Sequence, residues 1–108
     1  MAKPMEITSI RYLTASPYMS KAQIANEFGC SNSTMARRLS ELDAQVQKGR
    51  YSDYTILDGG GVTYVNYLAF VDYLKYRKML QDGRRVPPFN PDKVAKAIGW
   101  GEMTRDMQ

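Results

Sequence analysis

The segment from residue 19 to residue 42, MSKAQIANEFGCSNSTMARRLSEL, constrains the fold of this chain more than any other. Its first half has three apolar residues at helical spacing: Ile24, Ala25 and Phe28. Ser20 can cap such a helix at its start, and Gly29, which tolerates a positive φ, can end it. We therefore predict a short helix that begins after Ser20 and ends at Gly29.

A second helix is predicted from about residue 31 to residue 42, after a tight turn. It either ends there or continues through Ala44 and Val46, and residues 48–50, Lys-Gly-Arg, end it. Ser31 or Ser33 can cap it, because a serine hydroxyl accepts hydrogen bonds from the free amides of a first turn. Its apolar residues also recur every three to four positions: Met35, Leu39 and Leu42. Ala25 lies four residues before Gly29, and two closely crossing helices need a small side chain and a permissive turn residue at these positions. The pattern is typical of a helix-turn-helix.

The opposite face of the second helix has polar side chains that form hydrogen bonds: Asn32, Ser33, Thr34, Arg37, Arg38 and Glu41. A helix that enters the major groove of DNA presents such a face to the base edges. We therefore take five of these residues as candidate DNA contacts: Asn32, Ser33, Thr34, Arg37 and Arg38. The alternative is an ordinary pair of helices with a solvated outer face, because a small residue followed by glycine also occurs by chance.

The charge of the chain favours a polyanionic partner. The 108 residues include 15 Lys and Arg and 11 Asp and Glu, a net charge of +4. Residues 1–50 have seven basic and four acidic residues, whereas residues 51–108 have eight and seven. The positive excess therefore lies mainly in the half with the predicted helix-turn-helix.

Several functional classes are disfavoured by the composition. The chain has one cysteine, Cys30, and no histidine, so an internal disulfide, the usual zinc sites and histidine-based catalysis are not expected. The carboxylates Asp53, Asp58 and Asp72 are scattered, and we expect neither an enzyme nor a bound cofactor. The chain has no apolar run of the ~20 residues that cross a membrane and no signal-peptide core. We expect a cytoplasmic protein of a bacterial host cell, associated with the nucleoid.

The residues before the predicted helix-turn-helix indicate one more helix. Pro4 can occupy a first helical turn, and an apolar stripe extends as far as Ala15. Its members are Met5, Ile7, Ile10 and Leu13. Ser16 and Pro17 then break the helix, and we expect a short extended segment that leads into Ser20.

The residues after the second helix change from helical to extended spacing. The runs YSDYTIL and VTYV flank the glycine turn DGGG, which predicts a β-hairpin, and a hairpin directly after a recognition helix is a wing. Asp58 at the tip disfavours phosphate contact, so we expect contacts from the Gly60 backbone and from four side chains: Thr55, Thr63, and the basic residues Lys48 and Arg50 at the hairpin base. The alternative is a hairpin that only covers the core.

The remaining residues predict a long helix and a tail. Asn66 can cap a helix that ends near Asp82 and Gly83, and its apolar surface is wider than one stripe. Tyr73 and Tyr76 on it belong either to the edge of the core or to a partner interface. A proline-rich linker then leads to a short helix that starts at Asn90 and Pro91, and the apolar residues from Phe89 to Trp100 either fold back or dock on another molecule. Disorder is expected from Met103 onward.

This order of elements resembles the winged-helix DNA-binding domains of phages and mobile elements. Residues 61–78, GVTYVNYLAFVDYLKYRK, are similar to the strand-then-helix ending of excisionase-like proteins, and the resemblance extends from about Ile7 to Leu80. It implies an α+β winged helix-turn-helix with three N-terminal helices, a hairpin wing, a following helix and a short helical tail. It also implies that Ser33, Thr34, Arg37 and Arg38 face the groove. The tip of this hairpin, Asp58 to Gly61, has no basic residue, whereas basic wings are common in that group.

These observations predict a DNA-binding domain in residues 1–82 and a linker with a tail in residues 83–108. The expected function is sequence-specific binding of double-stranded DNA, as a transcriptional regulator or as a recombination directionality factor that assists a site-specific recombinase. We expect a homodimer or cooperative oligomer on DNA, because one small domain reads only a short stretch of groove. The alternative is a protein–protein adaptor that uses the aromatic helix and the tail.

Overall fold

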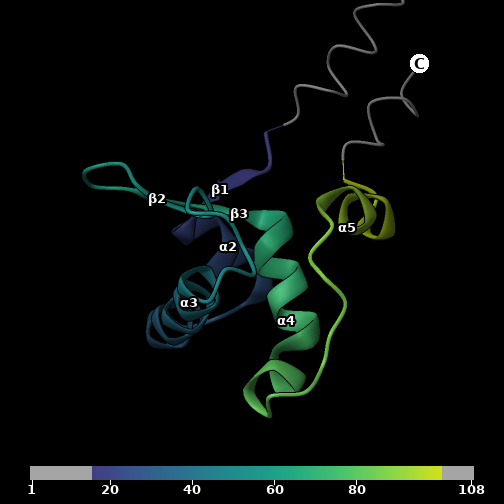
Figure 1. Ribbon diagram of the computed structural model, residues 1–108. Helices are drawn as coiled ribbons and strands as arrows, with labels where there is room; N and C mark the ends of the chain where they lie inside the picture. Colours follow the sequence, from purple (N-terminus) through teal and green to yellow (C-terminus); the bar gives the residue numbers. More distant parts are fainter. Residues whose placement is uncertain (1–15, 101–108) are drawn as a thin grey trace, which may run out of the picture. The chain divides into compact units, whose positions relative to one another are not determined.

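A computed structural model describes residues 16–100 of the chain (Figure 1). These residues form an α+β fold, as predicted, with four described helices and one three-stranded antiparallel sheet. The chain divides into two compact units, of which one is Tyr18–Phe89, and the other includes residues 90–100. The predicted helix from Pro4 to Ala15 and the predicted disorder from Met103 onward lie outside the described residues.

The unit Tyr18–Phe89 begins with a strand that leads directly into a helix. Strand β1 (Tyr18–Ser20) precedes helix α2 (Lys21–Phe28), and Ser20 caps that helix. The Ser20 hydroxyl accepts from the amide of Gln23 at 3.1 Å, and the Gln23 side chain accepts from the amide of Ser20 at 3.0 Å, which completes a capping box. Gly29 ends the helix with a φ of 66°, so both predicted boundaries are confirmed.

Helix α3 (Asn32–Gln47) follows the turn and continues five residues beyond Leu42, so it takes the longer of the two lengths that the sequence allowed. Ser31, one of the two predicted caps, accepts from the amide of Thr34 at 3.2 Å. The predicted apolar positions are confirmed, because Met35 and Leu42 are buried and Leu39 packs against the core. The end falls at Lys48, directly before Gly49 with its φ of 91°.

The predicted hairpin is present as strands β2 (Ile56–Asp58) and β3 (Thr63–Asn66). Strand β3 is the centre of the sheet, because β1 pairs with it on one side and β2 on the other. The sequence predicted the extended segment at β1 but not its pairing with β3. Side chains alternate across the sheet, so Val65 is fully buried against the helices while Tyr64 is 41% exposed on the opposite face.

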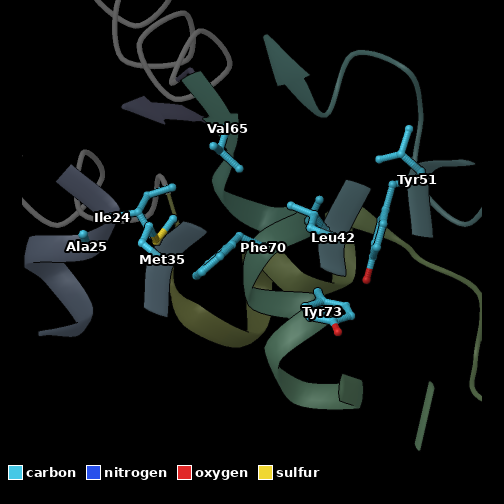
Figure 2. Close-up of a cluster of buried hydrophobic side chains, with 10 residues drawn as sticks. Ile24, Ala25, Met35, Leu42, Tyr51, Val65, Phe70 and Tyr73 are labelled. Atoms are coloured by element: carbon cyan, nitrogen blue, oxygen red, sulfur yellow. The ribbon is translucent and has the colours of Figure 1, made fainter. Parts of the chain in front are cut away.

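Helix α4 (Tyr67–Gln81) starts directly after β3, with Asn66 as its predicted cap, and ends at Asp82. Its N-terminal half lines the core of the unit together with α2, α3 and the sheet (Figure 2). The largest fully buried side chains in the described residues are Tyr73, Phe70, Ile24, Met35, Leu42 and Val65. Tyr73 is 1% exposed and therefore belongs to the core rather than to a partner surface.

The segment after α4 returns to the same core. Phe89 packs edge-on against Tyr51, with 5.1 Å between the ring centroids. Of the two alternatives for Phe89, the structure therefore supports folding back. Helix α5 (Pro91–Ile98) belongs to the other unit and has its predicted cap at Asn90 and its predicted end at Gly99. Ile98 on this helix is 43% exposed.

Candidate nucleic-acid interface

The first half of the exposed face of α3 combines one arginine with small side chains. Arg37 is exposed, and exposed small residues recur around it at helical spacing: Ser33, Ala36, Ser40 and Ala44. The larger exposed residues Asp43 and Gln47 follow toward the C-terminal end of the helix. Small side chains allow a helix to approach another surface closely, and the major groove, about 12 Å wide, admits an α-helix. The sequence prediction omitted Ala36, Ser40 and Ala44, although a count of helical positions opposite Met35 and Leu42 finds all three.

The N-terminal end of α3 has a cluster of hydroxyl groups. The Ser31 hydroxyl lies 3.3 Å from that of Ser33 and donates to the hydroxyl of Thr34 at 3.1 Å. Arg37 donates from Nη2 to Thr34 Oγ1 at 3.4 Å, a long and weak contact that does not neutralise its charge. Asn32 is exposed beside them. The first turn, NSTM, contains no carboxylate that would neutralise the positive end of the helix dipole, and Arg37 follows in the second turn.

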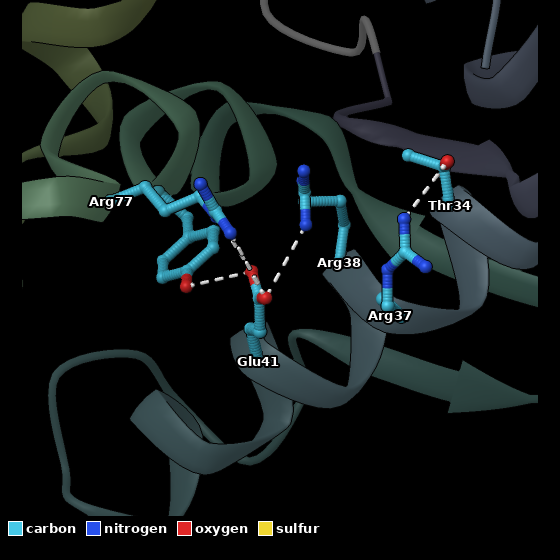
Figure 3. Close-up of polar contacts among 6 residues, drawn as sticks. Thr34, Arg37, Arg38, Glu41 and Arg77 are labelled. Carbon is cyan, nitrogen blue, oxygen red and sulfur yellow. Dashed lines mark hydrogen bonds and ion pairs between the residues drawn. The ribbon is translucent and has the colours of Figure 1, made fainter. Parts of the chain in front are cut away.

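Arg38 points toward α4 and is held by a second cluster, which we call the Glu41 network (Figure 3). Its members are Arg38, Glu41, Tyr73 and Arg77. Glu41 Oε1 accepts from Arg77 Nε at 2.8 Å and from the Tyr73 hydroxyl at 3.0 Å. Arg38 Nη1 reaches Glu41 Oε2 at 3.3 Å. The hydrogen bond from Arg77 is the largest effect that lowers the pKa of Glu41, so this side chain stays ionised at neutral pH.

Arg50 was predicted to contact DNA, and the structure contradicts this prediction because the guanidinium group of Arg50 is buried inside the unit. Its side chain is 10% exposed, and Nη2 donates to Asp72 Oδ2 at 2.8 Å. Nη1 donates to the carbonyl of Pro87 at 2.8 Å, and Nε donates to the Tyr51 hydroxyl at 3.2 Å. A guanidinium group with these internal partners is not available to a phosphate. The position of Arg50 in the sequence indicates the hairpin base but does not reveal burial.

The Tyr51 hydroxyl completes this group, which we call the Asp72 cluster (Arg50, Tyr51, Asp72 and the carbonyl of Pro87). Tyr51 donates to Asp72 Oδ2 at 2.6 Å, and it is 3% exposed. Burial raises the pKa of Tyr51, and the hydrogen bond to the Asp72 carboxylate raises it further, so the phenol keeps its proton. The Asp72 cluster therefore links the loop after α3, helix α4 and the segment before Phe89.

The tip of the β2–β3 hairpin is exposed, but the Gly60 amide, which was predicted to donate to phosphate, already has a partner within the hairpin. Asp58 Oδ1 accepts from the amide of Gly60 at 3.0 Å, and this contact occupies the backbone group that we expected to bind phosphate. The amide of Gly59 donates to the carbonyl of Val62 at 2.8 Å. Thr55 is 2% exposed and donates to the carbonyl of Ser52, so the structure contradicts its expected contact with DNA. Thr63 is half-buried opposite Asp58 in the register, and Lys48 remains exposed at the end of α3. Of the predicted contacts in this region, Lys48 is thus the cation that faces solvent.

Residues 16–100 contain no group of three or more metal-ligating side chains that could hold an ion. None of the helices among them is both long and apolar enough to cross a membrane.

The exposed stripe and the hydroxyl cluster of α3 form one surface with Arg37, and the Glu41 network lies beside it. Comparison of the chain with protein-family models, curated proteins and solved structures gave no match.

Proposed function

We propose that the unit Tyr18–Phe89 is a winged helix-turn-helix that binds double-stranded DNA, with α3 in the major groove. The observation that carries the proposal is the exposed stripe of α3, where Arg37, in the second turn of the helix, stands among small side chains. A guanidinium group can donate two hydrogen bonds to the O6 and N7 atoms of guanine, and small neighbours allow it to reach them. The Ser33 and Asn32 side chains are then placed for further contacts to bases or phosphates.

The order of the elements supports the same proposal. Helices α2 and α3 meet at the αL turn of Gly29, and the β2–β3 hairpin follows α3 as a wing. Figure 1 shows this hairpin extending from the sheet. Because the Gly60 amide is bonded to Asp58, we assign the wing a lesser part in binding and assign phosphate contact to Lys48. From the resemblance of residues 61–78 to excisionase-like proteins seen in the sequence, we further propose a role in a phage or mobile element, where the protein acts by occupying its DNA site.

The alternative function, a protein–protein adaptor, requires an exposed aromatic surface on α4 and the tail. Two aromatic residues expected on that surface pack in the core instead. Tyr73 is buried, and Phe89 packs against Tyr51. If two chains pair on DNA, they must therefore use other residues. Sedimentation of the free and DNA-bound protein would measure this stoichiometry directly.

The first prediction concerns Arg37. The full chain is mixed with a pool of duplexes that have a randomised centre, and the bound duplexes are separated by gel retardation and sequenced. We expect enrichment of a defined site, and Arg37→Ala should weaken binding to that site by about 1–3 kcal/mol and relax the preference at one base pair.

Arg85→Ala is the matched control, because Arg85 is exposed in the segment after α4 and the change in charge is the same. It should keep the base preference of the parent protein. Absence of a retarded complex at low salt would refute DNA binding. Equal effects of Arg37→Ala and Arg85→Ala would refute the assignment of Arg37 as a base contact.

A further inference from the structure

The Glu41 network has two guanidinium groups for one carboxylate. Arg77 is the closer partner of Glu41, with Nε at 2.8 Å from Oε1 and Nη2 at 3.3 Å from Oε2. Tyr73 adds a third hydrogen bond from α4. Arg38 contributes one contact at 3.3 Å. The network thus has a net charge of +1, and Arg38 has the weaker of the two ion pairs.

Release of Arg38 would leave Glu41 fully paired. The three hydrogen bonds from Arg77 and Tyr73 stay within reach of the carboxylate when Arg38 moves, so no ionised group is left without a partner. The Arg38 side chain is 22% exposed, and an ion pair between partly exposed residues three positions apart is weak. A guanidinium group binds phosphate strongly, often through two parallel hydrogen bonds.

On the basis of the proposed function, we propose that Arg38 is an exchangeable phosphate contact. On DNA its guanidinium group leaves Glu41 for a backbone phosphate, while Arg77 and Tyr73 keep the carboxylate paired. Arg37, one residue earlier on the exposed stripe, stays the base contact. Arg77 is then a positioning residue, because it touches no DNA and acts on binding through Glu41. The partner is the phosphate backbone of the same duplex that α3 reads.

The experiment measures the affinity of the full chain for its enriched duplex over a series of KCl concentrations. Arg38→Gln should reduce the slope of log affinity against log salt by about one, and at about 0.1 M salt it should weaken binding about 8-fold on every sequence. Arg77→Gln should weaken binding about 2- to 5-fold, because Glu41 then holds Arg38 more firmly. Lys78→Gln is the matched control for Arg77→Gln, since Lys78 is exposed on the same helix.

Restoration of binding tests the positioning role. Adding Glu41→Gln to the Arg77→Gln variant should restore the affinity, because Arg38 is freed. Asp43→Asn in the same background changes the charge of α3 equally but acts at an exposed side chain, and it should restore less. Arg77→Lys keeps the positive charge and should weaken binding less than twofold. This variant replaces Arg77→Gln if circular dichroism shows that Arg77→Gln does not fold.

The outcomes separate this inference from the proposed function. If the parent protein binds and Arg38→Gln has the parent salt slope, the exchange is refuted and DNA binding by α3 stands. If Asp43→Asn restores binding as well as Glu41→Gln does, the effect is one of net charge, and the positioning role of Arg77 is refuted. If the parent protein binds no duplex, both proposals are refuted.

Discussion

Two clusters of arginine, carboxylate and tyrosine connect α4 to the rest of the unit Tyr18–Phe89, and they differ in burial. In the Asp72 cluster the ion-paired side chains of Arg50 and Asp72 are 10% and 6% exposed. In the Glu41 network Arg77 and Glu41 are 28% and 25% exposed. The shortest ion-pair contact is 2.8 Å in both clusters. Similar groups therefore meet at the same distance with very different access to water.

The difference in burial assigns the two clusters to different tasks. Taking charged groups out of water is costly, so each member of the Asp72 cluster depends on the others being present. The partly hydrated pairs of the Glu41 network are individually weak and can be exchanged for other partners. We infer that the Asp72 cluster holds the segment before Phe89 on the core, whereas the Glu41 network leaves Arg38 available to a ligand.

The largest effect is expected for Asp72→Ala. This change leaves the buried Arg50 guanidinium without its carboxylate, which costs about 3–5 kcal/mol. A unit of this size has only about 5–15 kcal/mol of stability in total, so the variant should be largely destabilised. Urea denaturation followed by circular dichroism measures the change.

Asp82→Ala on the same helix is the control, because Asp82 is exposed at the helix end. The combined change Arg50→Met and Asp72→Leu should recover most of the lost stability, because a buried ion pair can often be replaced by apolar residues. A loss below about 1 kcal/mol in Asp72→Ala would show that the Asp72 cluster is hydrated in solution, and the contrast between the clusters would disappear.

The two clusters also show how far the sequence predicts this molecule. Helix caps such as Ser20 and Asn66, and the glycine that ends α2, were predicted because they are local signals in consecutive residues. The pairing of β1 with β3 joins residues far apart in the sequence, and no local pattern reports it.

The candidate site was predicted less completely than the helices, for the same reason. Arg37 and Arg38 are adjacent and look alike in sequence, yet Arg38 pairs with Glu41 three residues later on the same helix, a local spacing that the sequence could have indicated. The second partner of Glu41, Arg77, is brought to it only by packing of α3 on α4, which no local pattern reports. Arg50 resembles a surface cation in the sequence because its carboxylate, Asp72, is 22 residues away in the chain. One sequence signal could have predicted the burial of Arg50: Asp72 is a charged residue in the otherwise apolar first half of α4, where it needs a partner.

An intermediate effect is expected for Tyr51→Phe. This change removes the hydroxyl that donates to Asp72 at 2.6 Å but keeps the ring that packs on Phe89. Arg50 still pairs with the carboxylate, so we expect the loss of one buried hydrogen bond to a charged group, about 1.5–3 kcal/mol. Urea denaturation again measures it. Tyr54→Phe is the control, because Tyr54 is 71% exposed and its change should stay within about 0.5 kcal/mol. Equal effects of the two changes would place the Tyr51 hydroxyl in water.

The smallest effect, and the one that depends on pH, is expected for Glu41→Gln. The hydrogen bond from Arg77 is the largest effect that holds the pKa of Glu41 below its ordinary value of 4.5 in the folded chain. The folded state therefore binds this proton less readily than the unfolded state, and the stabilisation is fully present above about pH 4.5 and is lost as the pH falls through the lowered pKa.

At pH 7 the loss in Glu41→Gln should be about 1 kcal/mol or less, because its ion pairs are partly hydrated. Below about pH 4.5 the parent protein should approach the variant in stability, since a protonated Glu41 and the glutamine that replaces it are both uncharged. Urea denaturation at a series of pH values follows the two curves. Asp43→Asn supplies the comparison for an exposed carboxylate on the same helix. If the free energies of unfolding of the parent protein and of Glu41→Gln differ by the same amount from neutral pH to well below pH 4.5, Glu41 has the same pKa in the folded and unfolded states. The Glu41 network would then be an open surface contact, and Arg38 would need no exchange to reach a phosphate.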